Sequence, residues 1–225
     1  MPPVASFHLV TYPRKVLLAK LLNIPAERWE LSEAQGCTFG RILGTGREHT
    51  TRTSISLSRW AAFAVWKSEE DLEEFLTSST LAKRWADSAS TLKEYRLEPL
   101  MARGRWDGQE PLGEMPPPSP SADTSRPVAA LTRASIPLVK WVRFSKAIGP
   151  VDDHLRQSPG CSLAVGMGEW PVGKLATFSI WESEQALSGF AYDGEAHSRA
   201  IAARYKENWF SEEFFCRFAV RDLAR

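Results

Sequence analysis

The sequence predicts an α+β protein made of two ferredoxin-like βαββαβ repeats that pack sheet to sheet as an intramolecular α/β barrel. The first observation is that "GCTFGRILGTG" at 36–46 and "GCSLAVGMGEW" at 160–170 share a Gly-Cys start and an apolar run, at an offset of 124. The second is that "AFAVWKSEEDLEEF" at 62–75 matches "TFSIWESEQALSGF" at 177–190, at an offset of 115. Internal repetition of this length indicates a duplicated structural unit.

The third observation is that both copies predict the same order of elements. Each begins with a short apolar stretch typical of a strand, "ASFHLVTY" or "VAALTRASI", followed by a helix with a proline near its first turn. The second helix starts at Ser68 or Ser183, where a serine N-cap is followed by acidic residues. The last strands are "YRLEPLMARG" and "EEFFCRFAV". The middle strands are expected at 37–44, 59–66, 161–168 and 174–181.

The βαββαβ order is that of the ferredoxin-like unit, whose sheet is covered by helices on one face only. Two such units can bury their bare faces against each other. We therefore predict an N-terminal repeat at 1–104 and a C-terminal repeat at 128–225. The segment 105–127 is rich in Pro, Gly and Ser and is expected to be an extended, protease-sensitive linker.

Composition excludes several classes of function. The 225 residues carry a net charge of +1 with scattered basic residues, which argues against nucleic-acid binding. No apolar run is long enough for a transmembrane segment, and "MPPVASFHLVTYP" does not resemble a signal peptide. Three cysteines are an odd, small number, which favours a reduced, cytoplasmic protein.

Strand periodicity in the second copy predicts a pocket. Leu163, Val165 and Met167 alternate with small residues, and the large side chains are expected to face the covering helices. The small side chains would then leave room for a flat or bulky ligand inside the barrel, although tight packing between the sheets is the open alternative. The expected pocket-lining residues are Ser162, Ala164, Gly166, Thr177 and Ser179.

No nucleophile elbow, phosphate loop, dinucleotide fingerprint or HExxH motif is present, so no catalytic residue is assigned. Cys37 and Cys161 occupy repeated positions at strand starts, where a small buried hydrophobe is the expected role; for Cys161 a thiolate ligand stays open. His197 follows Asp193, which can cap a short helix whose apolar face would include His197. The helix dipole would keep the imidazole neutral, as a metal ligand requires, but a satisfied core or surface histidine is the alternative.

Several segments of the second half resemble the spheroidene monooxygenase family. They are "VAALTRASI", "GMGEWP", "ATFSIWES", "FAYDGEAH" and "NWFSEEFFCRF". The resemblance is strong over 128–221 and weak over 1–104, and it implies a heme-dependent oxygenase of acyclic carotenoids. It also implies that the C-terminal repeat is the heme-binding half and that His197 is the axial ligand of a heme b iron. Arg143, Arg199 and Arg204 are candidates to pair the heme propionates, or are solvated helix charges.

The resemblance therefore implies a heme-dependent monooxygenase that oxidises a hydrophobic small molecule. Because no flavin or NAD fingerprint is visible, electrons would come from a ferredoxin or reductase, or the oxidant would be peroxide. Other heme chemistry on the same scaffold, such as aldoxime dehydration or oxidation of an N–O substrate, is the alternative. A non-catalytic heme or hydrophobe carrier is a third reading, and a homodimer stays open.

Overall fold

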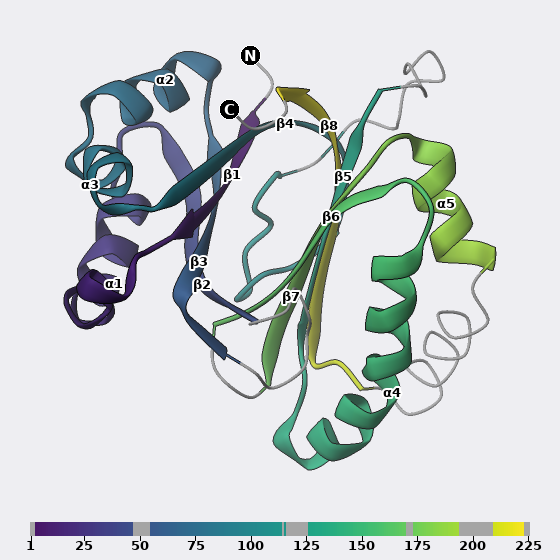
Figure 1. Cartoon of the computed structure of the whole chain (residues 1–225). Coiled ribbons are helices and arrows are strands. Elements are labelled where there is room, and N and C mark those ends of the chain that lie inside the picture. The colour runs from purple at the N-terminus through teal and green to yellow at the C-terminus, as the bar shows by residue number, and fades with distance from the viewer. Residues whose placement is uncertain are drawn as a thin grey trace. The chain divides into compact units, whose positions relative to one another are not determined.

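Antiparallel strands and helices alternate along the chain, which confirms the predicted α+β class. The structure, a computed structural model, describes residues 3–46, 55–113, 115, 126–169, 173–193 and 209–222. These residues contain eight strands and five α-helices (Figure 1). None of the described helices is long and apolar enough to cross a membrane. The chain divides into two compact units, one of Met1–Thr45, Ser56–Pro99 and Val220–Arg225, the other of Gly46–Ile55 and Leu100–Ala219.

The first unit is an antiparallel sheet with helices on one face. Its strands lie in the order β2-β3-β1-β4, and the central strand β1 is antiparallel to both β3 and β4. A serine N-cap begins α2, as predicted, because Ser68 Oγ accepts a hydrogen bond from the Asp71 N–H at 3.2 Å. The elements are β1 (Val4–Thr11), the 3₁₀ turn η1 (Arg14–Val16), α1 (Leu17–Ser32), β2 (Cys37–Gly46), β3 (Ile55–Trp66), α2 (Glu69–Ser78), α3 (Thr80–Ser88) and β4 (Thr91–Gly104).

Aromatic side chains join this sheet to its helices. Trp66 of β3 lies 4.8 Å from Phe75 of α2, measured between ring centroids, and Phe75 lies 6.0 Å from Trp85 of α3. The indole N–H of Trp66 donates to Ser6 Oγ at 2.9 Å, so this buried polar atom is satisfied. The helix-covered face of the first sheet is therefore filled by large rings.

One polar side chain in this core has no hydrogen-bond partner within the described residues. His8 of β1 is buried, and both of its ring nitrogens are unpaired there. Its ring lies 5.4 Å from that of Trp85. Burial lowers the pKa of His8 from 6.5 to about 4, with a smaller contribution from the charge of Arg96. The folded protein therefore holds this imidazole neutral.

We expect His8 to make the fold less stable as the pH falls from 6.5 to about 4. In that window the unfolded chain protonates His8 and the folded chain does not, so protons favour unfolding. The lowered pKa corresponds to roughly 3 kcal/mol lost across the window. Urea unfolding at a series of pH values measures it, with His8→Phe as the matched variant. Equal pH dependence in the two proteins would show that His8 contributes nothing.

The second unit repeats the arrangement. Its strands lie in the order β6-β7-β5-β8, and in Figure 1 the green helices α4 and α5 lie on one side of this sheet. Ser183 caps α5, as predicted, since its Oγ accepts from the Ala186 N–H at 3.2 Å. That the two units are ferredoxin-like repeats packed sheet to sheet stays a prediction. The elements are β5 (Val128–Ser135), α4 (Leu138–Gln157), β6 (Cys161–Gly168), β7 (Lys174–Trp181), α5 (Glu184–Asp193) and β8 (Glu212–Asp222).

Candidate active site

The residues predicted to hold heme fall mostly outside the described chain. His197, Arg199 and Arg204 lie in the interval 194–208, which the structure does not describe. Arg143 is described; it lies on α4 with an exposed side chain. The grouping of these four residues around a heme therefore stays a prediction.

Two of the five residues predicted to line a pocket, Ala164 and Ser179, lie on the face of the second sheet that the helices cover. Ala164 packs in one buried cluster with Leu155 of α4 and Leu187 of α5. Ser179, its register partner, accepts a hydrogen bond from the indole N–H of Trp181 at 3.0 Å. The five predicted residues are Ser162, Ala164, Gly166, Thr177 and Ser179, of which Ser162 is exposed.

Large rings from β7 and from α5 pack together on this face. Trp181 lies 5.2 Å from Phe190 of α5, measured between ring centroids, and the small strand residues make room for both rings. The large strand residues, including Val165 and Phe178, point to the other face because side chains alternate along a strand. The helix-covered face of this sheet therefore carries small residues such as Ala164 beside the large Trp181.

Ala164→Phe is accordingly expected to lower the free energy of unfolding by about 1–3 kcal/mol, because a phenyl ring overpacks a filled core. Thermal unfolding measures this loss. Ser162→Phe is the matched control at the exposed neighbour, with an expected change within about 0.5 kcal/mol. Unchanged stability in Ala164→Phe together with blocked ligand binding would instead restore the small-residue pocket.

A buried arginine lies at the centre of a cluster of charged side chains, on the face of the second sheet that its helices do not cover. Arg133 of β5 has a fully buried guanidinium, with Nη2 2.9 Å from Asp107 Oδ1 and Nε 3.3 Å from Glu169 Oε1. Its Nη1 donates to Glu212 of β8. Lys174 adds a second cation, 2.8 Å from Asp107 Oδ1. Three carboxylates therefore surround one guanidinium, which is the arrangement that lets a charge be buried.

Residues of this charge cluster also hold the segment 104–113 against the sheet through hydrogen bonds. Trp106 is fully buried; its indole N–H donates to Glu169 Oε1 at 2.7 Å, and its ring lies 6.1 Å from that of Phe214. Glu212 accepts from the backbone N–H groups of Asp107 and Gly108 at 2.8 and 2.7 Å. The first part of the expected linker is thus packed in place in the second unit.

The pKa of Glu212 reflects these contacts. Partial burial raises it, but the N–H groups of Gly108 and Asp107 and the charge of Arg133 outweigh burial. The pKa of Glu212 therefore lies below its usual value, and the carboxylate stays charged near neutral pH.

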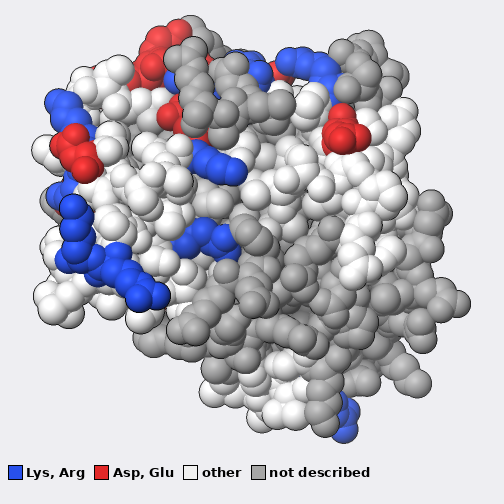
Figure 2. Space-filling model, viewed as in Figure 1, with Lys and Arg blue, Asp and Glu red and all other residues white. Residues whose placement is uncertain are grey.

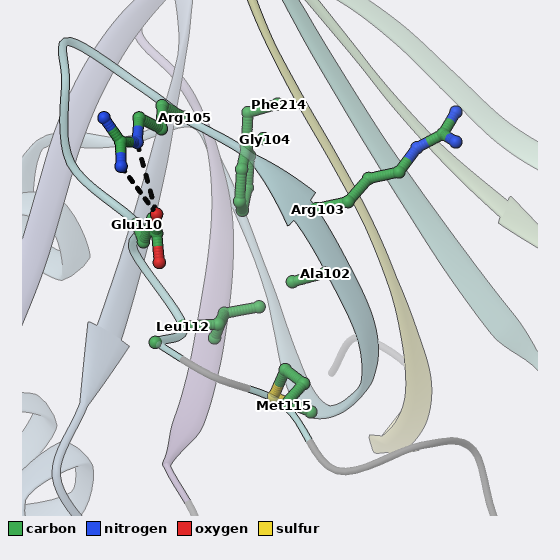
Figure 3. A pocket seen from close by; sticks show the side chains of 9 residues that line it. Ala102, Arg103, Gly104, Arg105, Glu110, Leu112, Met115 and Phe214 are labelled. Atoms are coloured by element: carbon green, nitrogen blue, oxygen red, sulfur yellow. Dashed lines mark hydrogen bonds and ion pairs between the residues drawn. The ribbon is translucent and has the colours of Figure 1, made fainter.

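A pocket of about 480 Å³ adjoins this segment (Figure 3). Leu112, Met115 and Phe214 form its apolar part, while the side chains of Arg105 and Glu110 point toward each other, with Nε 3.2 Å from Oε1. The pocket is thus lined by charged as well as apolar side chains. The lining residues are Ala102, Arg103, Gly104, Arg105, Glu110, Leu112, Gly113, Met115 and Phe214.

Gly104 is required where the pocket meets β8. Its φ is +84°, and a Cβ at this position would lie 2.2 Å from the carbonyl oxygen of Glu213. The chain can therefore turn from β4 into the pocket-lining segment only with glycine here.

Two histidines and two cysteines outside the predicted heme site lie in packed or buried surroundings. Burial raises the pKa of the Cys161 thiol and raises that of Cys216 well above its usual value, so both favour the protonated form. His154 stacks on Phe190 at 5.5 Å, and His8 lies under the helices of the first unit. Within the described residues no group of three or more His, Cys, Asp or Glu side chains is placed to hold a metal ion. His49 and His197 lie outside the described residues, so His197 as the iron ligand stays a prediction.

Comparison with known proteins decides the family. No family model matches the chain. The spheroidene monooxygenase of Rubrivivax gelatinosus is 36% identical over 234 residues, covering 96% of this chain and 88% of that protein. The chain belongs to the spheroidene monooxygenase family. The Rhodobacter capsulatus spheroidene monooxygenase is 30% identical, covering 97% of this chain and 90% of that protein. That of Cereibacter sphaeroides is 34% identical, covering 79% of this chain and 53% of that protein.

Membership in this family supports a monooxygenase, and hence an oxidoreductase. The predicted family is confirmed, and the similarity extends over the first half of the chain as well as the second. Among solved structures, one aldoxime dehydratase aligns with a TM-score of 0.64 at 12% identity, covering 98% of this chain and 82% of that one. Another, in complex with butyraldoxime, aligns with a TM-score of 0.63 at 10% identity. At such low identity the likeness concerns the fold alone.

Proposed function

We propose that this protein is a heme-dependent monooxygenase that inserts one oxygen atom into a hydrophobic small molecule of the spheroidene type. The observation that carries the proposal is the 36% identity to a spheroidene monooxygenase over 96% of the chain. A relationship over both halves supports a shared reaction more strongly than a shared fold does.

In this proposal the second unit holds the heme through His197, and Arg143, Arg199 and Arg204 pair its propionates. Bound heme would supply the activation of oxygen. The chain would supply the ligand, the apolar surroundings of the substrate and the exclusion of water. A ferredoxin or reductase donates the electrons, or peroxide replaces O₂ and the electron donor.

Aldoxime dehydration is the second candidate, because an aldoxime dehydratase shares the fold with a TM-score of 0.64. Oxidation of an N–O substrate and non-catalytic binding of heme or a hydrophobe are further alternatives on the same scaffold. The fold supports all of these equally, because it does not choose the reaction. The sequence relationship to monooxygenases therefore places oxygenation first.

The absorbance spectrum of the purified protein tests the heme part of the proposal. After reconstitution with heme and reduction, we expect the Soret band of a histidine-ligated heme that shifts when carbon monoxide is added. The shift requires an open position on the iron opposite the protein ligand. If the protein binds no heme, or if the spectrum of the reduced protein does not change when carbon monoxide is added, the heme part of the proposal is overturned.

A further inference from the structure

One face of α1 exposes large apolar side chains. Leu18 and Leu22 are each 73% exposed, and Trp29 is 66% exposed. Positions 18, 22 and 29 fall on one side of a helix with 3.6 residues per turn. A single exposed leucine is ordinary, but two leucines and a tryptophan on one helix face mark an interaction surface.

Basic side chains accompany this apolar face. Arg14 and Lys15 are exposed just before α1, and Arg28 is exposed near its end. In Figure 2 the lower-left surface, where Figure 1 places α1, carries blue atoms among uncharged ones. Residues 14–26 contain no Asp or Glu, and the first exposed acid, Glu33, follows the helix. The exposed face therefore combines apolar and positive groups.

The acidic side chains of α1 are buried or partly buried, so they do not lie among the exposed apolar side chains. Glu27 is turned inward, with 2% of its side chain exposed, and accepts a hydrogen bond from the equally buried Lys20. Glu30 is partly buried and pairs with Arg84 at 2.7 Å. These internal pairs neutralise the acids of α1, so the net charge of its outer face is positive.

The first helix of the second unit shows the same combination. Leu138, Val139 and Val142 are exposed large hydrophobic residues, and residues 138–151 contain no Asp or Glu. At the repeat offset of 124, Val142 corresponds to Leu18. One exposed apolar position, Leu18 or Val142, is thus shared by the first helices of the two units.

We propose that α1 docks onto the interfacial region of an anionic lipid bilayer. Aliphatic side chains enter the acyl boundary, Trp29 suits the headgroup level, and the flanking cations attract anionic headgroups. A second copy of the chain fits this face less well, because a two-fold contact of α1 with α1 would bring like charges together. The proposal is independent of the proposed heme chemistry.

Vesicle flotation of the full-length protein tests the docking. We expect it to float with vesicles of phosphatidylcholine mixed with phosphatidylglycerol, to float poorly with phosphatidylcholine alone, and to be released by salt. Leu18→Ser combined with Leu22→Ser should weaken binding about tenfold or more, and Arg14→Gln with Lys15→Gln should weaken only the binding to anionic vesicles. All four sites are exposed, so unchanged circular dichroism is expected.

The matched control is Ile55→Ser with Leu57→Ser, which removes two exposed apolar side chains from β3 and should retain wild-type binding. The proposal is overturned if the wild type does not float with anionic vesicles, or if the Leu18 and Leu22 variant floats as well as the wild type. It is also overturned if sedimentation shows a dimer that this variant converts to a monomer, because the face would then bind a second copy.

Discussion

Arg133→Ala is expected to lower the free energy of unfolding by about 3–5 kcal/mol. The change removes the guanidinium that Asp107, Glu169 and Glu212 share, and leaves carboxylates partly buried without their cation. It also loosens the segment that carries Trp106, whose indole N–H shares Glu169 Oε1 with Arg133. Equilibrium unfolding in urea, followed by circular dichroism, measures the loss.

Lys174→Ala is the matched control in the same cluster. Its side chain is 36% exposed, and an exposed ion pair contributes less than about 1 kcal/mol. Arg133→Lys should recover little stability, since a single ammonium group cannot reach three carboxylates in the way a guanidinium fork does. A cost for Arg133→Ala no larger than that of Lys174→Ala would contradict the organising role of the cluster.

His197→Ala is expected to abolish heme binding and oxygenation while the apo fold survives. The position equivalent to His197 in the first half, at the offset of 115, is Ala82, so only one half can ligate iron in this way. If the proposed ligand is right, we expect one heme per chain. Heme content by absorbance and substrate turnover measure the loss, and circular dichroism reports the fold.

His154→Ala is the control for this prediction, because His154 lies on α4 against Phe190 and should leave heme content unchanged. Full heme content, an unchanged spectrum and full turnover in His197→Ala would show that the ligand assignment is wrong. Cys161 and the three other histidines would then be the next residues to test.

Much of the secondary structure could be predicted because local signals determine it. Apolar runs bounded by glycine gave the strands beginning at Cys37 and Cys161, and the serine caps gave the starts of α2 and α5. The sequence suggested one helix after Ser68, whereas the structure has two. Ser79 adopts an extended backbone and caps α3 through the Ala82 N–H, which separates the helices.

The candidate site could be predicted only in part, because its contacts are distant in sequence. In the sequence, Arg133 is a polar residue within a predicted apolar strand. The carboxylates that pair with it lie 26, 36 and 79 residues away along the chain. Trp106 was the available signal, since a tryptophan followed by Asp-Gly in a Pro-rich segment indicates an anchored turn. The face of Ala164 was wrongly predicted because strand alternation gives two faces but not which of them the helices cover.

Incorporation of isotopic oxygen tests the central claim most directly. The heme-reconstituted protein, with a reductant and an acyclic carotenoid such as spheroidene, is incubated under ¹⁸O₂, and the product is examined by mass spectrometry. A monooxygenase transfers one atom of O₂ to its substrate, so we predict one ¹⁸O per oxygenation event and no product when O₂ is withheld. Conversion of an aldoxime without O₂, with no labelled product from the carotenoid, would contradict the account.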